Sequence, residues 1–186
     1  MTAQVRRALR IVAIAVVTLA PAGAGLADDP RSLEFNIKAT FLYKFAPYVE
    51  WPSFVFPSPS SPLYLCIAGM PAFNDFLDRA VQGQHFNAHP IEVRRYDTID
   101  GQETCHIMFV AGSPTQSVAD ILTMLRDRPI LTVTDLPAET QAKGIINFVI
   151  RDNHVRFEID ARAAAAHHLE ISSRLLTLAV LPERRD

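Results

Sequence analysis

Several patterns that would assign a common activity are missing from this sequence. Glycine is scarce, with seven in 186 residues, and none forms G-x-G-x-x-G or G-x-x-x-x-G-K-[ST], the turns that hold nucleotide phosphates. G-x-S-x-G, H-E-x-x-H and C-x-x-C are also absent, so the sequence does not indicate the enzyme classes that these motifs mark. The sequence therefore predicts no cofactor and no enzyme activity. An enzyme whose reactive residues converge from distant segments stays an alternative.

Charge of one sign is not concentrated anywhere in the chain. Eighteen basic and 20 acidic residues leave a net charge of −2, and no basic block predicts nucleic acid as a partner. Beyond the first 27 residues, no apolar run approaches the roughly 20 residues that cross a bilayer. We therefore expect no membrane insertion by the remainder of the chain.

The first 27 residues have the layout of a secretory signal peptide. Three arginines lie within the first ten residues, residues 11–20 are apolar, and small residues stand at Gly25 and Ala27. The apolar run is too short for a spanning helix, so cleavage is expected between Ala27 and Asp28. Residues 28–186 then form one exported domain, a length that supports a single core.

The two cysteines, Cys66 and Cys105, are the smallest even number that can pair. Two unrelated buried thiols are the alternative, since free cysteine is often buried. In an exported protein a disulfide persists, so we expect a Cys66–Cys105 bridge. It would close a loop of about 40 residues and contribute roughly 4 kcal/mol in the chain-entropy model.

The first predicted element is a helix over residues 33–50. Ile37, Phe41, Phe45 and Val49 recur every fourth residue and share one face. Pro47 predicts a kink, or a new turn that starts there. A loop rich in proline and serine follows from residue 52 to residue 62.

Strands and helices then alternate. The predicted strands are 63–69, 90–96, 105–112 and 129–135, and the predicted helices between them are 71–83 and 113–128, the second capped by Ser113. Strand–helix–strand units joined by short loops indicate an α/β fold, with a mainly parallel sheet and helices on both faces.

The C-terminal part adds an antiparallel hairpin to this sheet. Its strands are 144–150 and 155–160, and Arg156 and Glu158 alternate with apolar residues, which predicts one wetter face. A short helix over 161–169 and a final helix over 172–181, capped by Ser172 or Ser173, complete the domain.

The histidines do not predict a metal or catalytic site. His85 and His89 lie four apart, but in a segment that resembles a loop, and a metal there would need further ligands. The neighbours 167–168 would point in different directions on a helix. Cys105 and His106 would face opposite sides of a strand, which places the imidazole poorly for activating the thiol.

Aromatic residues are unusually frequent along the first helix and just after it. One interpretation is a helix packed deep in the core. The other is that one side contacts another chain, because aromatic residues are enriched at interfaces. The candidate interface residues are Phe41, Tyr43, Phe45, Tyr48 and Trp51.

Four passages together resemble one family. They are "IKATFLYKFAPYVEWP" (37–52), "LYLCIAGMPAFNDFL" (63–77), "TCHIMFVAG" (104–112) and "GIINFVIRDNHVRFEIDARAAAAHHLEISSRLLTLA" (144–179). The chain is similar to the YfiR-like family of exported proteins, also described as a domain of unknown function. The resemblance implies a compact α/β homodimer in the periplasm. It implies binding to the periplasmic region of an inner-membrane sensor, a diguanylate cyclase, whose cyclic-di-GMP output it represses in response to redox stress.

The sequence departs from the family pattern at two places. Cys66 and Cys105 match one family cysteine pair, but a second pair falls at about Thr140 and Asn147, so that bridge is missing here. Any redox role that depends on the second pair is therefore in doubt. His168 stands where relatives often have glycine.

Two functions remain as hypotheses. The first is a periplasmic, non-enzymatic regulator that binds and restrains a signalling protein, with a Cys66–Cys105 bridge that is either structural or a redox switch. The second is a periplasmic accessory protein of a sensing or transport system that binds a small ligand. Its crevice would lie at the carboxyl ends of the strands, near Gly69, Met70, Gly112 and Ser113.

Overall fold

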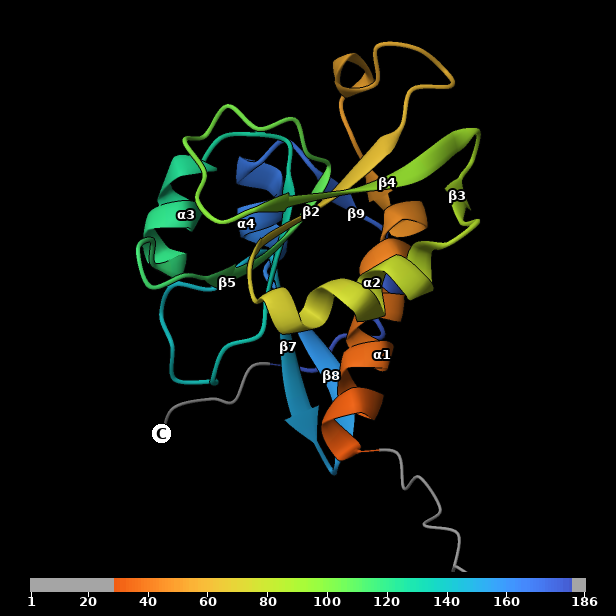
Figure 1. The fold of residues 1–186 in the computed structure, drawn as a ribbon. Helices are drawn as coiled ribbons and strands as arrows, with labels where there is room; N and C mark the ends of the chain where they lie inside the picture. Colours follow the sequence, from red (N-terminus) through yellow and green to blue (C-terminus); the bar gives the residue numbers. More distant parts are fainter. Residues whose placement is uncertain (1–28, 182–186) are drawn as a thin grey trace, which may run out of the picture.

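A seven-stranded sheet forms the centre of the fold in a computed structural model, which describes residues 29–181 (Figure 1). Its spatial order is β3-β4-β2-β5-β6-β7-β8. The four pairs from β4 to β7 are parallel, and the two outer pairs, β3–β4 and β7–β8, are antiparallel. The predicted α/β class with a mostly parallel sheet is confirmed. The strands are β2 (Leu63–Gly69), β3 (His85–Phe86), β4 (His89–Tyr96), β5 (Ile107–Gly112), β6 (Leu131–Thr134), β7 (Ile146–Arg151) and β8 (His154–Ile159).

Five α-helices and three short 3₁₀ turns connect or cover these strands within the described residues. They are α1 (Pro30–Lys44), η1 (Ala46–Tyr48), η2 (Ser53–Val55), η3 (Pro71–Phe73), α2 (Asn74–Val81), α3 (Val118–Met124), α4 (Ala161–Ala166) and α5 (Ser173–Leu176).

The first helix ends earlier than its periodicity predicts. Asp29 caps α1 by accepting a hydrogen bond from the Arg31 amide, and the helix ends at Lys44 rather than at residue 50. Pro47 has no N–H to donate and would clash with the preceding turn, so η1 starts a separate turn around it. The chain then forms β1 (Val49–Glu50), a strand that the sequence analysis did not predict.

A second, two-stranded sheet joins the end of the first helical segment to the C-terminal part. β1 pairs antiparallel with β9 (Glu170–Ile171), and the Ser172 amide donates to the Tyr48 carbonyl at 2.9 Å. Strands of two residues are too short to show a periodicity, which is why both were missed.

Other boundaries also differ from the predictions. His85 and Phe86 belong to β3 rather than to a loop, and β5 begins at residue 107 rather than at residue 105. Helix α3 starts at residue 118, because Ser117 and not Ser113 caps it through a reciprocal capping box with Asp120. The last helix, α5, has only four residues, and its predicted cap at Ser172 is confirmed.

The predicted C-terminal hairpin is confirmed, with a tighter turn. Asp152 and Asn153 both have positive φ, 48° and 60°, the conformation that two-residue hairpin turns require. Glu158 was expected on a wetter face but is only 6% exposed, because Lys143 and Arg151 lie against its carboxylate. On the outer edge of β8, the Val180 amide donates to the Phe157 carbonyl at 2.9 Å.

Buried side chains form two separate clusters. Successive residues of a strand point to opposite faces, and Leu65 and Ile67 of β2 join the larger cluster, which also contains side chains from α1 and α2. Cys66 and Ala68 join the smaller cluster, which contains Ile121 of α3.

Candidate functional site

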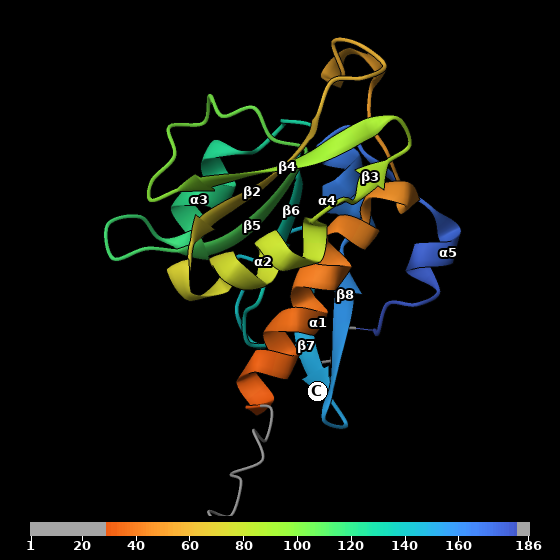
Figure 2. The ribbon, with the colours of Figure 1, turned by 45° about the vertical axis from the view of Figure 1, so that its right-hand side comes forward.

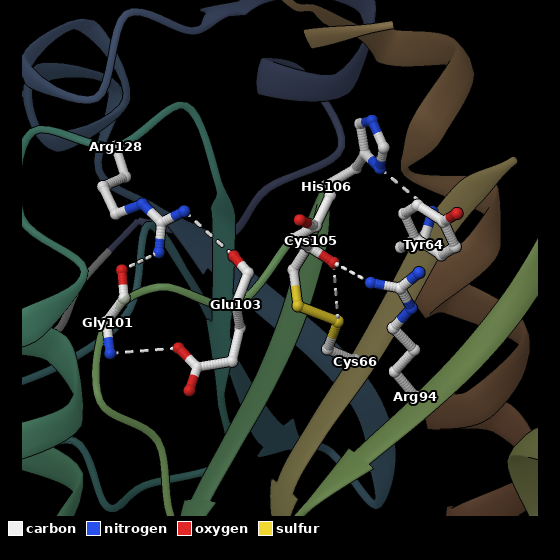
Figure 3. The surroundings of a disulfide bond; sticks show 9 residues. Tyr64, Cys66, Arg94, Gly101, Glu103, Cys105, His106 and Arg128 are labelled. Carbon is white, nitrogen blue, oxygen red and sulfur yellow. Dashed lines mark hydrogen bonds between the residues drawn. A yellow bond between two sulfur atoms is a disulfide. The ribbon is translucent and has the colours of Figure 1, made fainter. Parts of the chain in front are cut away.

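The Cys66–Cys105 disulfide joins the middle of β2 to the segment just before β5 (Figure 3). Cys66 lies within β2, and Cys105 lies two residues before β5, with 6.0 Å between the two Cα atoms. Cys66 is fully buried and Cys105 is 7% exposed. The predicted pairing is therefore present in the structure, in a place that bulk solvent scarcely reaches.

An arginine lies over an aromatic ring beside the bridge. The guanidinium carbon of Arg94 is 3.4 Å from the ring centre of Tyr64, and its Nη1 donates to the Thr104 carbonyl at 3.2 Å. The same carbonyl lies 3.9 Å from the Cys66 sulfur. The cation–π contact with Tyr64 positions the Arg94 guanidinium, whose hydrogen bond in turn holds Thr104, the residue that precedes Cys105.

The segment 97–106, here called the disulfide loop, has further polar attachments. Arg128 donates to the carbonyls of Gly101 and Glu103, and the Glu103 carboxylate accepts from the Asp100 and Gly101 amides at 2.8 and 3.0 Å. The buried Gln116 side chain bonds to both the amide and the carbonyl of Ile99 at 2.8 Å. The loop is therefore held at several points besides the disulfide.

His106 is a buried imidazole with a defined tautomer. Its Nδ1 accepts from the Tyr64 amide at 2.9 Å, so the proton lies on Nε2, which faces the Val55 carbonyl at 3.3 Å. The Phe56 ring stacks between the rings of His106 and His89, at centroid distances of 4.4 and 4.2 Å. Burial lowers the pKa of His106 to about 4. The hydrogen bond to the Val55 carbonyl raises this pKa, whereas the nearby His89 and Arg94 lower it further.

The remaining histidine and cysteine candidates do not come together. Cys105 is in the disulfide, and the His106 ring points toward Tyr64 (Figure 3). His85 and His89 contact separate backbone carbonyls, those of Gly83 and Ser61. Within residues 29–181, no group of three or more histidine, cysteine or acidic side chains is arranged to hold a metal.

At the place of the predicted crevice, the ends of β2 and β5 lie directly against each other. A Cβ atom placed on Gly69 would lie 1.9 Å from the Gly112 carbonyl oxygen, so only glycine allows the two strand ends to approach this closely. Both glycines also have positive φ, 88° and 75°. The sequence located the glycines correctly, but they serve close packing at this point.

An apolar surface lies where α1 runs beside β8, an arrangement visible in both ribbon views (Figures 1 and 2). We call it the α1–hairpin surface, and it borders a cavity of about 490 Å³. Leu33 and Ile150 are 55% and 50% exposed. Its apolar residues are Leu33, Ile37, Phe41, Ile150 and Val155.

The five candidate interface residues occupy different environments. Phe45 is 1% exposed and packs against the rings of Phe148 and Phe157, inside the core. Phe41 is partly exposed and belongs to the α1–hairpin surface. The other three, Tyr43, Tyr48 and Trp51, are partly buried against the larger cluster.

A buried charge on α1 was not predicted from the sequence. Lys38 of α1 is 2% exposed, and its ammonium group contacts the carboxylates of Glu34 and Asp135. The ammonium also lies 5.9 Å from the ring centre of Phe148. The i, i+4 spacing of Glu34 and Lys38 was the available signal, but Asp135 lies 97 residues away in sequence.

The positions that depart from the family pattern have clear environments. Asn147 is 2% exposed, and its side chain bonds to Thr134 and to the backbone of Leu136. Together with Thr140 it lines a cavity of about 670 Å³. His168 has a φ of 58°, the left-handed region in which glycine is favoured.

A comparison with known families decides membership. The chain matches a family described as YfiR/HmsC-like over residues 35–180, which includes all four passages quoted above. The chain belongs to this YfiR/HmsC-like family. The match runs from α1 to the Val180 contact on β8, so the family unit contains both sheets, the disulfide and most of the α1–hairpin surface, with Leu33 just before its first residue. Among curated proteins, none matches the chain at a significant level.

The predicted cleavage site between Ala27 and Asp28 lies outside the described residues. Within the described part, no helix combines the length and the apolar character needed to cross a bilayer.

Proposed function

We propose that this chain is a periplasmic regulator that binds an inner-membrane diguanylate cyclase and restrains it. The observation that carries the proposal is membership of the YfiR/HmsC-like family over most of the chain. The family is regulatory rather than catalytic, and we propose the same for this chain, without enzyme activity. The regulator would act after removal of residues 1–27, as a homodimer, which light scattering on the purified mature chain tests.

The docking site in this proposal is the α1–hairpin surface. Leu33 and Ile150 expose apolar area from two elements that are far apart in sequence, and Phe41 joins them. Contiguous exposed apolar area of this kind marks interaction sites. Binding would shift the partner toward its inactive state, by the difference between its affinities for the two states.

The disulfide is structural in this proposal rather than a redox switch. Both sulfurs are buried, and the loop that carries Cys105 has independent attachments through Arg128 and Gln116.

The fold is proposed to have helices on both faces of the sheet, which the division into two clusters of buried side chains supports.

Cyclic-di-GMP in the native host tests this function. Deleting the gene should raise the level, and wild-type protein should restore it. Leu33→Asp should restore it poorly, because a carboxylate on the surface would have to be desolvated on binding. Leu178→Asp is the matched control, since Leu178 is 61% exposed outside this surface. An unchanged level after deletion would contradict the function, whereas equal rescue by both variants would contradict only the surface.

A further inference from the structure

The largest of the cavities described here, about 670 Å³, lies away from both the disulfide and the α1–hairpin surface. One wall is the loop between β6 and β7, and the other is the junction of β8 with α4. Small-molecule sites in proteins typically measure about 300–1,000 Å³. The cavity therefore has the size of a ligand site, and the proposed regulatory contact does not use it.

The loop wall is fixed at both ends. At its start, the buried Asn147 side chain holds Leu136 through both the amide and the carbonyl, at 3.0 Å each. At its end, the Gly144 amide donates to the Thr134 hydroxyl at 3.0 Å. A Cβ on Gly144 would lie 2.7 Å from the Thr132 carbonyl oxygen, so this end is closely packed. The cavity is thus a built feature rather than a gap beside a loose loop.

The carboxylates of the cavity already have partners. Glu158 is 6% exposed; its Oε2 accepts from Lys143 at 3.1 Å, and its buried Oε1 forms an ion pair with Arg151 at 3.5 Å without accepting a hydrogen bond. Asp160 accepts from the amides of Arg162 and Ala163 at 2.9 Å, as the cap of α4. Neither acidic group is therefore available as the main acceptor for a ligand.

By contrast, several side-chain donors that line the cavity have no hydrogen-bond partner among the described residues. No residue in the described part of the chain bonds to the guanidinium of Arg162, the amide of Gln141 or the hydroxyl of Thr140. Lys143 spends one of its three N–H groups on Glu158. Ile145 and Ile159 add apolar surface beside these donors. A lining with unbonded side-chain donors, in which the carboxylates are paired with cations or cap a helix, suits a ligand that brings acceptor oxygens and negative charge.

We propose that this cavity binds a small organic anion, whose carboxylate or phosphate oxygens are held by Arg162, Lys143 and Thr140. The apolar part of the ligand lies against Ile145 and Ile159. The site is independent of the proposed docking to a cyclase, and either can fail without the other.

The test is a titration of the mature chain with succinate and, separately, with inorganic phosphate, followed by NMR of the Arg162 side chain and the Gln141 and Gly144 amides. Saturable shifts at these groups with either anion support the site, and the tighter anion identifies the head group. Arg162→Gln should weaken binding at least about tenfold, equivalent to 1.4 kcal/mol. Thr140→Val should weaken it less and leaves the charge unchanged.

Arg174→Gln is the matched control, because it removes the same charge from α5, outside the cavity. Binding by this variant should equal that of the wild type. Equal weakening by Arg162→Gln and Arg174→Gln would show non-specific attraction and would overturn the proposal. The proposal would also be overturned if neither anion saturates the site at about 10 mM, a concentration roughly ten times a Kd of 1 mM.

Discussion

His168 occupies a backbone conformation that disfavours most side chains. It directly follows His167, the C-cap residue of α4, and its φ is 58°. Glycine enters this left-handed region without steric cost, whereas a residue with a Cβ is strained there. The backbone of this position therefore favours glycine over histidine.

Replacing His168 with glycine should stabilise the protein. The release of strain exceeds the extra freedom of glycine in the unfolded chain, so we expect a gain of about 0.5–1 kcal/mol in the free energy of unfolding. Urea denaturation at neutral pH measures it. His154→Gly in β8, where φ is not positive, is the control and should lose stability. A loss of stability in both variants would contradict the strain argument.

His106 should make the fold sensitive to acid. In the unfolded chain the imidazole takes up its proton near pH 6.5, but in the folded chain only near pH 4. The unfolded state therefore binds more protons between these values, and stability falls as the pH falls through this window. A pKa difference of this size corresponds to roughly 3 kcal/mol across the window.

His106→Asn removes this titration while an amide oxygen still faces the Tyr64 N–H. The free energy of unfolding, measured from pH 7.5 to pH 4, should fall less steeply in the variant than in the wild type. The imidazole should also give an NMR titration midpoint well below 6. Parallel pH profiles for the two proteins would mean that other groups cause the acid sensitivity.

Among the elements, the disulfide loop combines a covalent and a non-covalent attachment. The bridge fixes its end at Cys105, while Arg128 and Gln116 fix its middle through backbone groups of Gly101 and Ile99. Loss of the bridge alone therefore leaves the loop with most of its native contacts.

The Cys66→Ala/Cys105→Ala variant should lose about 4 kcal/mol of stability but keep a folded loop. Hydrogen exchange should show the Ile99 and Gly101 amides still protected. Adding Arg128→Met should remove the protection at Gly101, because Arg128 holds the Gly101 and Glu103 carbonyls, and the Gly101 amide donates to the carboxylate of that same Glu103. If the Ile99 and Gly101 amides exchange at the unfolded rate in the Cys66→Ala/Cys105→Ala variant, with Arg128 still present, the disulfide is the only attachment of the loop. That result would favour a redox switch.

The same element scale shows what the sequence could predict. Strands such as β2 and β5 are continuous apolar runs, so their existence and their parallel pairing followed from composition and order. Strands β1 and β9 depend on a contact between residues more than 100 positions apart, and no local pattern encodes it. Buried charges were missed for the same reason, since Lys38 is stabilised by Asp135.

For the whole molecule, β1 and β9 bring the first helical segment and the C-terminal elements into one unit. The aromatic residues of the first helix differ in burial, and contact with another chain stays a prediction. Phe45 lies in the core and Phe41 lies at the surface, because the choice depends on where β7 and β8 pack. The sequence predicted the cysteine pair but not the 670 Å³ cavity, which is formed by segments on either side of the hairpin.

The exported product should begin at Asp28 and contain no free thiol. Mass spectrometry of the protein recovered from the periplasm measures both, with alkylation before and after reduction. Cleavage follows from the length of the apolar run, and oxidation follows from the compartment. A full-length product in the cytosol, or two alkylated cysteines before reduction, would contradict the proposed location.

The hydrogen bond from Val180 to Phe157 has a practical consequence for handling the protein. A sheet margin with open backbone groups is a template on which another molecule can add a strand, and self-association into fibres begins in this way. The chain's own tail occupies one acceptor on that margin. Variants truncated before residue 180 should therefore precipitate more readily on storage, and affinity tags are better placed after the last residue.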